Sequence, residues 1–175
     1  MKSTGVVRRV DDLGRIVIPK EIRRTLRIRD GESLEIFVDR EMIALKKFSK
    51  MTDMDEISKQ LVDIVNTVTG QNVFITDRDN FIAGSGNLRK KYLNKPISKT
   101  LEIIMKERTT VVEHSLHNIE LVDSVPEKYA YVVSPVIMNG DAIGLVVIFS
   151  EQNIGQVEEK MADVVSKFLG KHIEE

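Results

Sequence analysis

The sequence contains no cysteine and no tryptophan, and only 5% of its 175 residues are aromatic. Without cysteine the chain can form no disulfide framework, thiolate nucleophile, iron–sulfur cluster or cysteine-ligated zinc site. Long hydrophobic runs are also missing. The stretch from Ile143 to Phe149, interrupted by Gly144, is far shorter than the roughly 18 residues that a membrane span needs. No basic and then apolar leader opens the chain. We therefore expect a soluble, unexported, cytoplasmic protein.

What is present is an ordinary apolar fraction of 42% and an uneven distribution of charge. The formal net charge is −1, but residues 1–50 hold 13 Lys and Arg against 8 Asp and Glu, whereas residues 51–175 hold 13 against 19. Seven of the eleven arginines lie in the first 29 residues. Guanidinium groups suit phosphates and base edges, and an acidic segment repels DNA. We therefore expect any nucleic-acid contact to lie in residues 1–50.

Residues 1–50 have the pattern of short β-strands around one short helix. β-branched runs flank the turn-forming segment Asp11–Gly14, and Pro19 can begin a helix because a first helical residue needs no N–H partner. The expected order is strand, strand, helix, strand, strand, over residues 6–10, 15–18, 20–27, 34–39 and 43–47. Domains this small usually need a metal, a disulfide or a partner to bury enough surface. We therefore predict that this segment folds as an intertwined homodimer.

Cations gather on one face of the expected helix. At about 100° per residue, Lys20, Arg23, Arg24 and Arg27 share one arc, and the apolar side chains of Ile22 and Leu26 point the opposite way. A solvated surface is the alternative interpretation of this face, but Glu21 is the one nearby acidic partner. On the two strands, Arg8 and Arg15 flank the turn, so strand pairing would bring them together.

The segment at residues 2–26 resembles the swapped-hairpin DNA-binding domain of the AbrB family in its sequence KSTGVVRRVDDLGRIVIPKEIRRTL, and the resemblance continues to Lys47. It implies a domain-swapped β-barrel dimer that binds duplex DNA without a helix-turn-helix. The family's DNA-contacting arginines carry over to Arg8, Arg15, Arg23 and Arg24. Accessory phosphate contacts are expected from Arg9, Lys20 and Arg27.

Residues 51–175 begin and end with long expected helices, from about residue 52 to Gly70 and from about residue 154 to residue 173. Both helices repeat apolar residues with the same spacing. Each helix could pack on its own sheet, or the two could form a bundle with another chain. The positions that would form the oligomerisation helices are Met54, Ile57, Leu61, Ile64, Val65, Val68, Ile154, Val157, Met161, Val164, Val165 and Phe168.

Between these helices the sequence predicts strands at residues 72–76, 81–84, 129–138 and 142–150 and a helix at residues 98–107. Asn139-Gly140 predicts a tight hairpin turn. This order, with NGDAIGLVVIFS at residues 139–150, resembles a GAF domain. The fold class is therefore α+β: an AbrB-type domain at residues 1–50 and a GAF-like sensor or oligomerisation domain at residues 51–175. GAF domains often bind a small molecule, and the sequence identifies neither a ligand nor its pocket.

No enzyme active site, cofactor site or metal site is expected. His114 and His117 lack a third ligand, and we interpret them as surface residues. Asp77 and Asp79 lack the rest of a calcium loop. Gly84-Ser85-Gly86 lacks the Lys-Ser/Thr of a phosphate loop.

An AbrB-type domain followed by a GAF-like domain resembles the SpoVT-type sporulation regulators over the whole chain. The resemblance implies a homotetramer that activates some forespore genes and represses others, with double-stranded DNA and other copies of itself as partners. Two alternatives remain open: an antitoxin-like interaction protein, and a metabolite-binding GAF protein with a basic tether.

Overall fold

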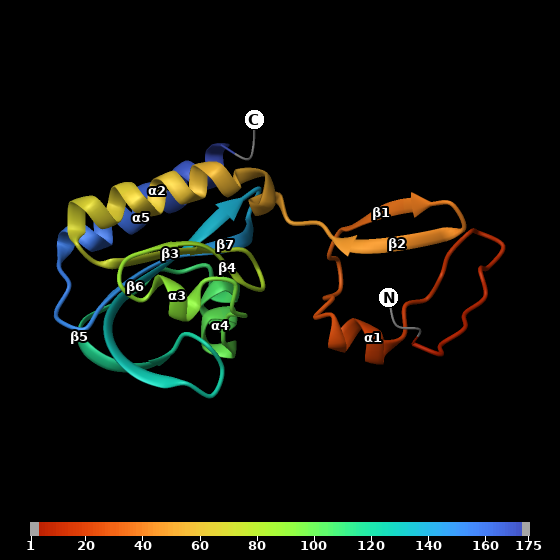
Figure 1. Cartoon of the computed structure of the whole chain (residues 1–175), viewed down its shortest axis with the longest axis horizontal. Coiled ribbons are helices and arrows are strands. Elements are labelled where there is room, and N and C mark those ends of the chain that lie inside the picture. Colours follow the sequence, from red (N-terminus) through yellow and green to blue (C-terminus); the bar gives the residue numbers. More distant parts are fainter. Residues whose placement is uncertain (1–3, 173–175) are drawn as a thin grey trace. The chain divides into compact units, whose positions relative to one another are not determined.

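The computed structural model describes residues 4–172 and divides the chain into two compact units (Figure 1). The N-terminal unit is Met1–Phe48 and the C-terminal unit is Ser49–Glu175. No helix within the described range is long and apolar enough to cross a membrane.

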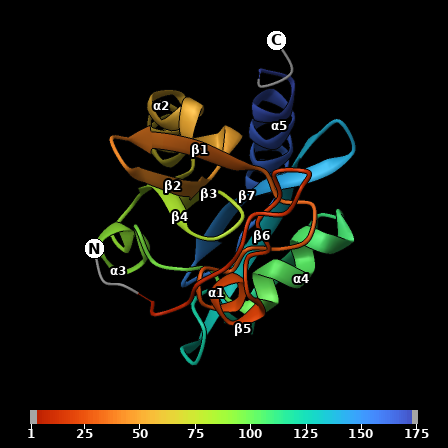
Figure 2. The same cartoon turned by 90° about the vertical axis from the view of Figure 1, so that its right-hand side faces the viewer.

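The N-terminal unit contains one short helix and one β-hairpin (Figures 1 and 2). Helix α1 is Lys20–Thr25, and strands β1 (Leu34–Asp39) and β2 (Met42–Lys47) pair antiparallel, with Leu34 opposite Lys47. The last two predicted strands are confirmed, and so is the predicted helix, although it ends at Thr25 and not at residue 27. Two residues in the turn between β1 and β2 reverse the chain, and one of them, Arg40, has a positive φ of 48°.

The first two predicted strands, at residues 6–10 and 15–18, are wrong for the single chain: residues 4–19 form a turn but no strand. The reason is the lack of partners. No apolar residue from 4 to 50 is buried, and Val7, Val17 and Val38 are 84%, 73% and 74% exposed. The apolar stripe expected on α1 is not buried either, since Leu26 is 55% exposed. A lone two-stranded hairpin supplies too little surface to order further strands.

The C-terminal unit is built on a five-stranded antiparallel sheet with the order β4-β3-β7-β6-β5. Its strands are β3 (Asn72–Thr76), β4 (Phe81–Ser85), β5 (Val111–Glu120), β6 (Pro126–Met138) and β7 (Asp141–Ser150). The predicted turn between β6 and β7 is confirmed, with positive φ at Asn139 (49°) and Gly140 (82°). The sequence did not predict the edge strand β5.

Helices cover both faces of this sheet (Figure 1). After a short 3-10 helix, Lys50–Met54, the long helices α2 (Asp55–Thr69) and α5 (Gln156–His172) lie on one face. Helices α3 (Arg89–Tyr92) and α4 (Lys99–Glu107) lie on the other. The predicted ends of two helices are confirmed by Gly70, the left-handed cap of α2, and by Ser98, which caps α4. The predicted end of the last helix, residue 173, lies outside the described residues.

Successive strand residues alternate between the two faces, as a pleated sheet requires. Val73 and Ile75 of β3 join the core under α2 and α5, whereas Phe74 between them joins the core under α3 and α4. Gly170 lets α5 approach the sheet closely, because a Cβ at this position would collide with the backbone oxygen of Ile137 on β6. The sheet thus has two separate hydrophobic cores, one under each pair of helices.

Candidate nucleic-acid interface

The turn at Asp11–Gly14 holds Arg15 in place. Oδ1 of Asp11 accepts hydrogen bonds from the backbone N–H of Leu13 at 3.0 Å and of Arg15 at 2.7 Å. Oδ2 accepts from the side-chain Nε of Arg15 at 2.7 Å. Gly14 completes the turn with a φ of +76°, which glycine adopts without strain. The Arg15 side chain is therefore 70% exposed, although its Nε and the backbone N–H of the same residue are both hydrogen-bonded to Asp11.

Arg8 and Arg9 precede this turn in an exposed segment. Nη1 of Arg8 donates to the carbonyl of Val7 at 3.1 Å, and neither arginine forms an ion pair with another residue of the described range. Arg8 and Arg9 thus present their charge to solvent. In the turn that follows them, the backbone N–H of Asp11 donates to the carbonyl of Arg15 and that of Gly14 donates to the carbonyl of Asp11, each at 3.0 Å.

The cations of α1 differ in their surroundings. Lys20 and Arg24 are exposed and form no ion pair with any residue from 4 to 172. Arg23 is half-buried: its Nη1 donates to Oδ1 of Asp30 at 2.7 Å, and its Nε is buried without a hydrogen-bond partner in the described part of the chain. Arg24 is therefore the more available of the two neighbouring arginines.

Arg27 does not share the arc of the other helical cations, so this part of the sequence prediction is wrong. The helix ends at Thr25, and Arg27 follows with a positive φ of 52°. The N–H of Ile28 donates to the carbonyl of Arg23 at 2.7 Å, and the N–H of Arg27 donates to that of Arg24 at 3.2 Å. This is the pattern of a Schellman motif, which ends a helix by satisfying its last carbonyls.

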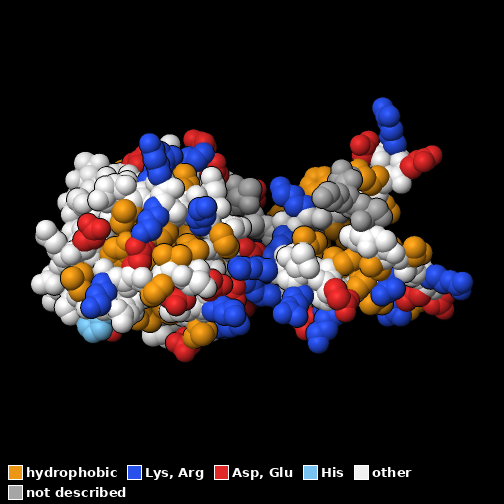
Figure 3. Space-filling model, turned by 60° about the horizontal axis from the view of Figure 1, so that its bottom comes forward, with side chains coloured by type: hydrophobic (Ala, Val, Ile, Leu, Met, Phe, Trp, Pro, Cys, Tyr) orange, Lys and Arg blue, Asp and Glu red, His pale blue; other side chains and the backbone are white. Residues whose placement is uncertain are grey.

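The sequence analysis missed the acidic residues that organise these cations. Besides Asp11 and Asp30, Glu32 is almost completely buried, with 5% of its side chain exposed, and pairs with Lys47 at 3.3 Å and Arg29 at 3.6 Å. The four-residue spacing of Asp11 and Arg15 is a signal that could have revealed one pair. The contact of Glu32 with Lys47 depends on the fold. Figure 3 shows Lys and Arg side chains beside exposed hydrophobic ones on one face of the N-terminal unit.

The two histidines considered as metal ligands lie on the edge strand β5. Nδ1 of His114 is 3.3 Å from the carbonyl oxygen of Ile154, and Nδ1 of His117 is 3.1 Å from that of Ser115. No group of three side chains in the described range has the arrangement of a metal site. His117 is also 3.3 Å from Oε2 of Glu113, across a local irregularity of the strand.

A partly buried polar cluster joins α3 to the sheet. Glu127 accepts hydrogen bonds from Tyr92 and Lys91, and the hydroxyls of Tyr92 and Tyr129 are 3.2 Å apart. Burial opposes ionisation of Glu127, but these hydrogen bonds outweigh it and lower the pKa of the carboxyl. Burial raises the pKa of Tyr92. The ring of Phe74 packs edge-on against Tyr92, with 5.7 Å between centroids, so side chains fill this face of the sheet.

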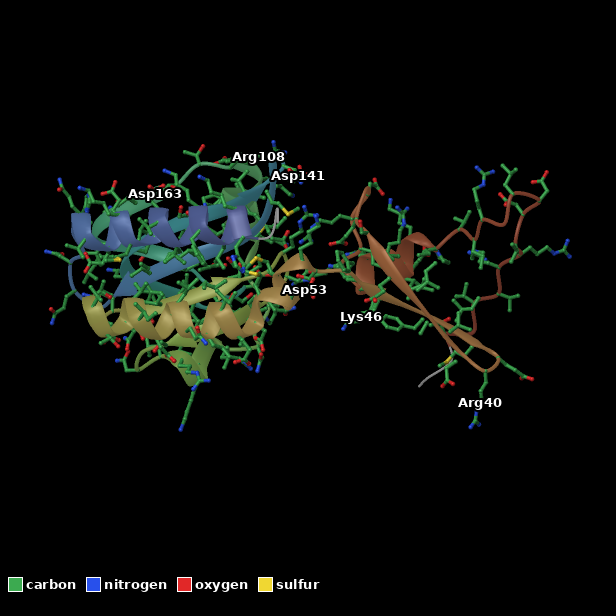
Figure 4. All side chains as sticks on the ribbon, turned by 90° about the horizontal axis from the view of Figure 1, so that it is seen from above. Arg40, Lys46, Asp53, Arg108, Asp141 and Asp163 are labelled. Carbon is green, nitrogen blue, oxygen red and sulfur yellow. The ribbon has the colours of Figure 1, made fainter. Side chains whose placement is uncertain are left out.

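The positions expected to form the oligomerisation helices fall into three groups. Val65 on α2 and Val165 on α5 are buried against the sheet, and Ile57, Leu61 and Met161 are partly buried against the same core. Met54 and Ile154 are buried as well, but they precede α2 and α5, because these helices begin at Asp55 and Gln156 and not near residues 52 and 154 as expected. Five side chains remain 44–61% exposed: Ile64, Val68, Val157, Val164 and Phe168. The interpretation that these helices pack on a sheet is confirmed. We call the five exposed residues the outer seam; α2 and α5, which carry it, lie side by side in Figure 4.

Comparison with known proteins identifies both units. Residues 53–174 match the family described as stage V sporulation protein T C-terminal, transcription factor, and residues 7–51 match antidote-toxin recognition MazE, bacterial antitoxin. A GAF domain of A. aeolicus, solved in an inactive state, superposes with a TM-score of 0.52 at 16% identity, covering 67% of this chain and 82% of that one. This likeness shows the fold of the C-terminal unit.

Two curated relatives from Bacillus subtilis (strain 168) match the chain. Transition state regulatory protein AbrB is 65% identical over 48 residues, which are 27% of this chain and 50% of that protein. Stage V sporulation protein T is 48% identical over 178 residues, covering 100% of both chains. An AbrB-like domain joined to a GAF-like domain defines a two-domain transcription factor. More narrowly, the chain belongs to the stage V sporulation protein T family.

Proposed function

We propose that the chain binds duplex DNA through residues 1–50 and regulates sporulation genes in the forespore, activating some promoters and repressing others. The observation that carries this proposal is the concentration of exposed arginines on the turn and helix of the N-terminal unit. Arg8, Arg15 and Arg24 present guanidinium groups to solvent, in a segment similar to AbrB. Arginine binds phosphate and guanine edges with two parallel hydrogen bonds, which suits this task.

The DNA-binding form is proposed to be a dimer of N-terminal units. The exposed apolar residues of this unit, including Val7, Val17 and Val38, have no partner surface within the described single chain. A second chain could cover them by completing the strands expected at residues 6–10 and 15–18. Such a dimer would present Arg8, Arg15, Arg23 and Arg24 twice, and its two-fold symmetry favours loosely palindromic sites. Arg9, Lys20 and Arg27 would add phosphate contacts.

Residues 51–175 are proposed to join two such dimers into a tetramer through the outer seam. Apolar side chains at helical spacing on an exposed face are typical of helix–helix packing between chains. The seam lies opposite the sheet, so it can pack on another chain without disturbing the core of its own unit. The proposed role of this unit is oligomerisation, and no cofactor is proposed for it.

Fluorescence anisotropy with a labelled AT-rich duplex tests the DNA-binding proposal. Arg15→Ala and Arg24→Ala should each weaken binding, because each removes two cationic contacts from the dimer. Arg89→Ala is the matched control, since Arg89 is an exposed arginine of the C-terminal unit. Unchanged affinity in both N-terminal variants would refute the assignment of the site.

An antitoxin-like role is the second candidate, and the match of residues 7–51 to the MazE family favours it. In that case the residues after the DNA-binding domain would wrap a toxin. Here a compact unit with its own two hydrophobic cores follows instead. Affinity purification of the tagged chain from its own cells distinguishes the two: a stoichiometric small toxin would support the antitoxin role.

A further inference from the structure

Asp11 has an unusual position for an acidic residue in a proposed DNA-binding surface. It lies four residues before Arg15, and its carboxylate would be close to the phosphates that Arg15 contacts. Simple electrostatics predicts that such a carboxylate weakens DNA binding by repulsion. The neighbouring Asp12 is also exposed, and its side chain has no hydrogen bond or ion pair within the described range. The contacts of Asp11 are different.

The two oxygens of Asp11 have separate tasks. Oδ1 closes the turn by accepting the N–H groups of Leu13 and Arg15 at 3.0 and 2.7 Å. Oδ2 accepts from Nε of Arg15 at 2.7 Å. These hydrogen bonds, the backbone bond from Arg15 first and its side-chain bond second, lower the pKa of Asp11, so the carboxylate stays ionised. A turn alone would need only Oδ1.

The bond through Nε leaves the outer part of the guanidinium available. Neither Nη group of Arg15 bonds another residue of the described range, and the side chain is 70% exposed. An arginine that is free in solution loses rotamer freedom when it binds, and that loss opposes association. Here the fold has already restricted the side chain through Asp11, while both Nη groups can still bind a phosphate or a base edge.

We propose that Asp11 is a positioning residue that holds the Arg15 guanidinium in its DNA-binding orientation. This inference rests on the proposed DNA binding and deepens it. Asp11 itself makes no contact with DNA in this account. Its favourable effect on the orientation of Arg15 exceeds its repulsion of the phosphates, and this is the opposite of what its charge alone predicts.

Asp11→Asn tests the proposal in the full-length chain, with affinity measured by fluorescence anisotropy on one labelled AT-rich duplex. The amide keeps an oxygen that can accept the two turn N–H groups, but its NH₂ group cannot accept from Nε of Arg15. We expect Asp11→Asn to weaken binding by about five- to tenfold, because the Arg15 side chain would then lose its rotamer freedom only when it binds DNA. Asp12→Asn removes the same charge one residue away and should leave affinity unchanged or raise it.

Two further variants separate positioning from a structural effect. In an Arg15→Ala background, Asp11→Asn should cause no further loss, because the side chain that it positions is gone. Arg15→Lys keeps the charge but replaces the guanidinium by a single ammonium group. If that group bonds Asp11, no second pair of donors is left for a phosphate or a base edge, so this variant should bind DNA as weakly as Asp11→Asn. Circular dichroism melting confirms that each variant folds.

The outcomes distinguish this inference from the proposed function. If the wild-type chain fails to bind DNA, the proposed function fails. If the wild-type chain binds and Asp11→Asn binds as tightly as Asp12→Asn, or Arg15→Lys binds like the wild type, the positioning role is overturned. If Asp11→Asn lowers DNA affinity equally in the wild-type and the Arg15→Ala backgrounds, the effect belongs to the turn, and the positioning role is overturned too.

Discussion

Arg23 and Arg24 are neighbours in sequence, but the structure gives them different roles. Arg23 is half-buried and bonded to Asp30, whereas Arg24 is exposed and unpaired within the described range. We predict that Arg23→Ala and Arg24→Ala both weaken DNA binding, but that only Arg23→Ala also lowers thermal stability. The loss should be at most about 1 kcal/mol, because Asp30, the partner of Arg23, is exposed to solvent. Circular dichroism melting of the two variants checks this. Equal melting temperatures would contradict a structural role for Arg23.

Glu127 makes the stability of the C-terminal unit depend on pH. Its pKa in the folded chain lies below the ordinary value of 4.5, because the hydrogen bonds from Lys91 and Tyr92 outweigh burial. A carboxyl with a lowered pKa stabilises the fold above its ordinary pKa, and this contribution is lost as the pH falls through the lower folded value. We therefore predict that Glu127→Gln loses less stability than the wild type on acidification from pH 7 to about pH 3.

Urea denaturation followed by tyrosine fluorescence measures this effect selectively, because all three tyrosines lie in the C-terminal unit. Glu107→Gln, at an exposed position on α4, is the control and should keep the wild-type pH dependence. The same slope in Glu127→Gln and in the wild type would show that the cluster does not contribute.

At the residue scale, the uneven distribution of arginine and the resemblance to the AbrB family single out the candidate arginines, and their contact with DNA stays a prediction. Arg15 and its turn follow from four consecutive residues. The pairing of Arg23 with Asp30 could not be predicted, since the two are seven residues apart and meet only after the chain has turned at the end of α1. The site itself remains a proposal.

The C-terminal helix α5 depends on Gly170 for its close packing on β6. Replacing a glycine within a helix by alanine is usually stabilising. At Gly170 the added Cβ would collide with the backbone oxygen of Ile137, so here the substitution should lower the stability of the unit. We predict that Gly170→Ala destabilises the unit by about 1–3 kcal/mol, measured by urea denaturation. Gly155→Ala is the control, because its Cβ would meet only the carboxylate of Glu158 at 3.7 Å. Equal stability of both variants would contradict this packing.

Elements with strong local patterns are predicted almost to the residue. The strand at residues 72–76 and the turn at Asn139-Gly140 agree with the structure, because buried β-branched runs and tight turns depend on local chemistry. Strand β5 was missed because half of its residues are exposed and an irregularity between Glu113 and His117 breaks its alternation. The strands expected at residues 6–10 and 15–18 need partners that a single chain does not contain.

The outer seam determines how many chains assemble in the proposed whole molecule. A charge placed in an apolar helix interface is costly to bury. We predict that Val164→Asp and Ile64→Asp each convert a tetramer into a dimer in sedimentation equilibrium, while Gln60→Asp, an exposed polar position on α2, leaves the tetramer intact. A wild-type chain no larger than a dimer, or a Val164→Asp variant that stays tetrameric, would contradict the role of the seam.

The division of charge gives the two ends of the chain opposite relations to DNA. Residues 1–50 carry an excess of five positive charges and residues 51–175 an excess of six negative charges. In a tetramer of such chains, DNA would bind at the N-terminal dimers. Once one dimer has bound its DNA site, the other dimer of the same assembly would meet a neighbouring DNA site at a raised local concentration. The composition shows this division directly, whereas the tetramer is implied by the family resemblance and depends on side chains left exposed after folding.

The most direct test of the account is the salt dependence of DNA affinity. Four arginines from each of two chains would give up to about eight phosphate contacts, so log K should fall with log salt concentration with a slope of up to about −7. In an Arg15→Ala/Arg24→Ala chain that still dimerises, half of those contacts are gone and the slope should fall to about half. A slope that is the same in the wild type and in this variant would contradict the claim that these arginines hold the DNA.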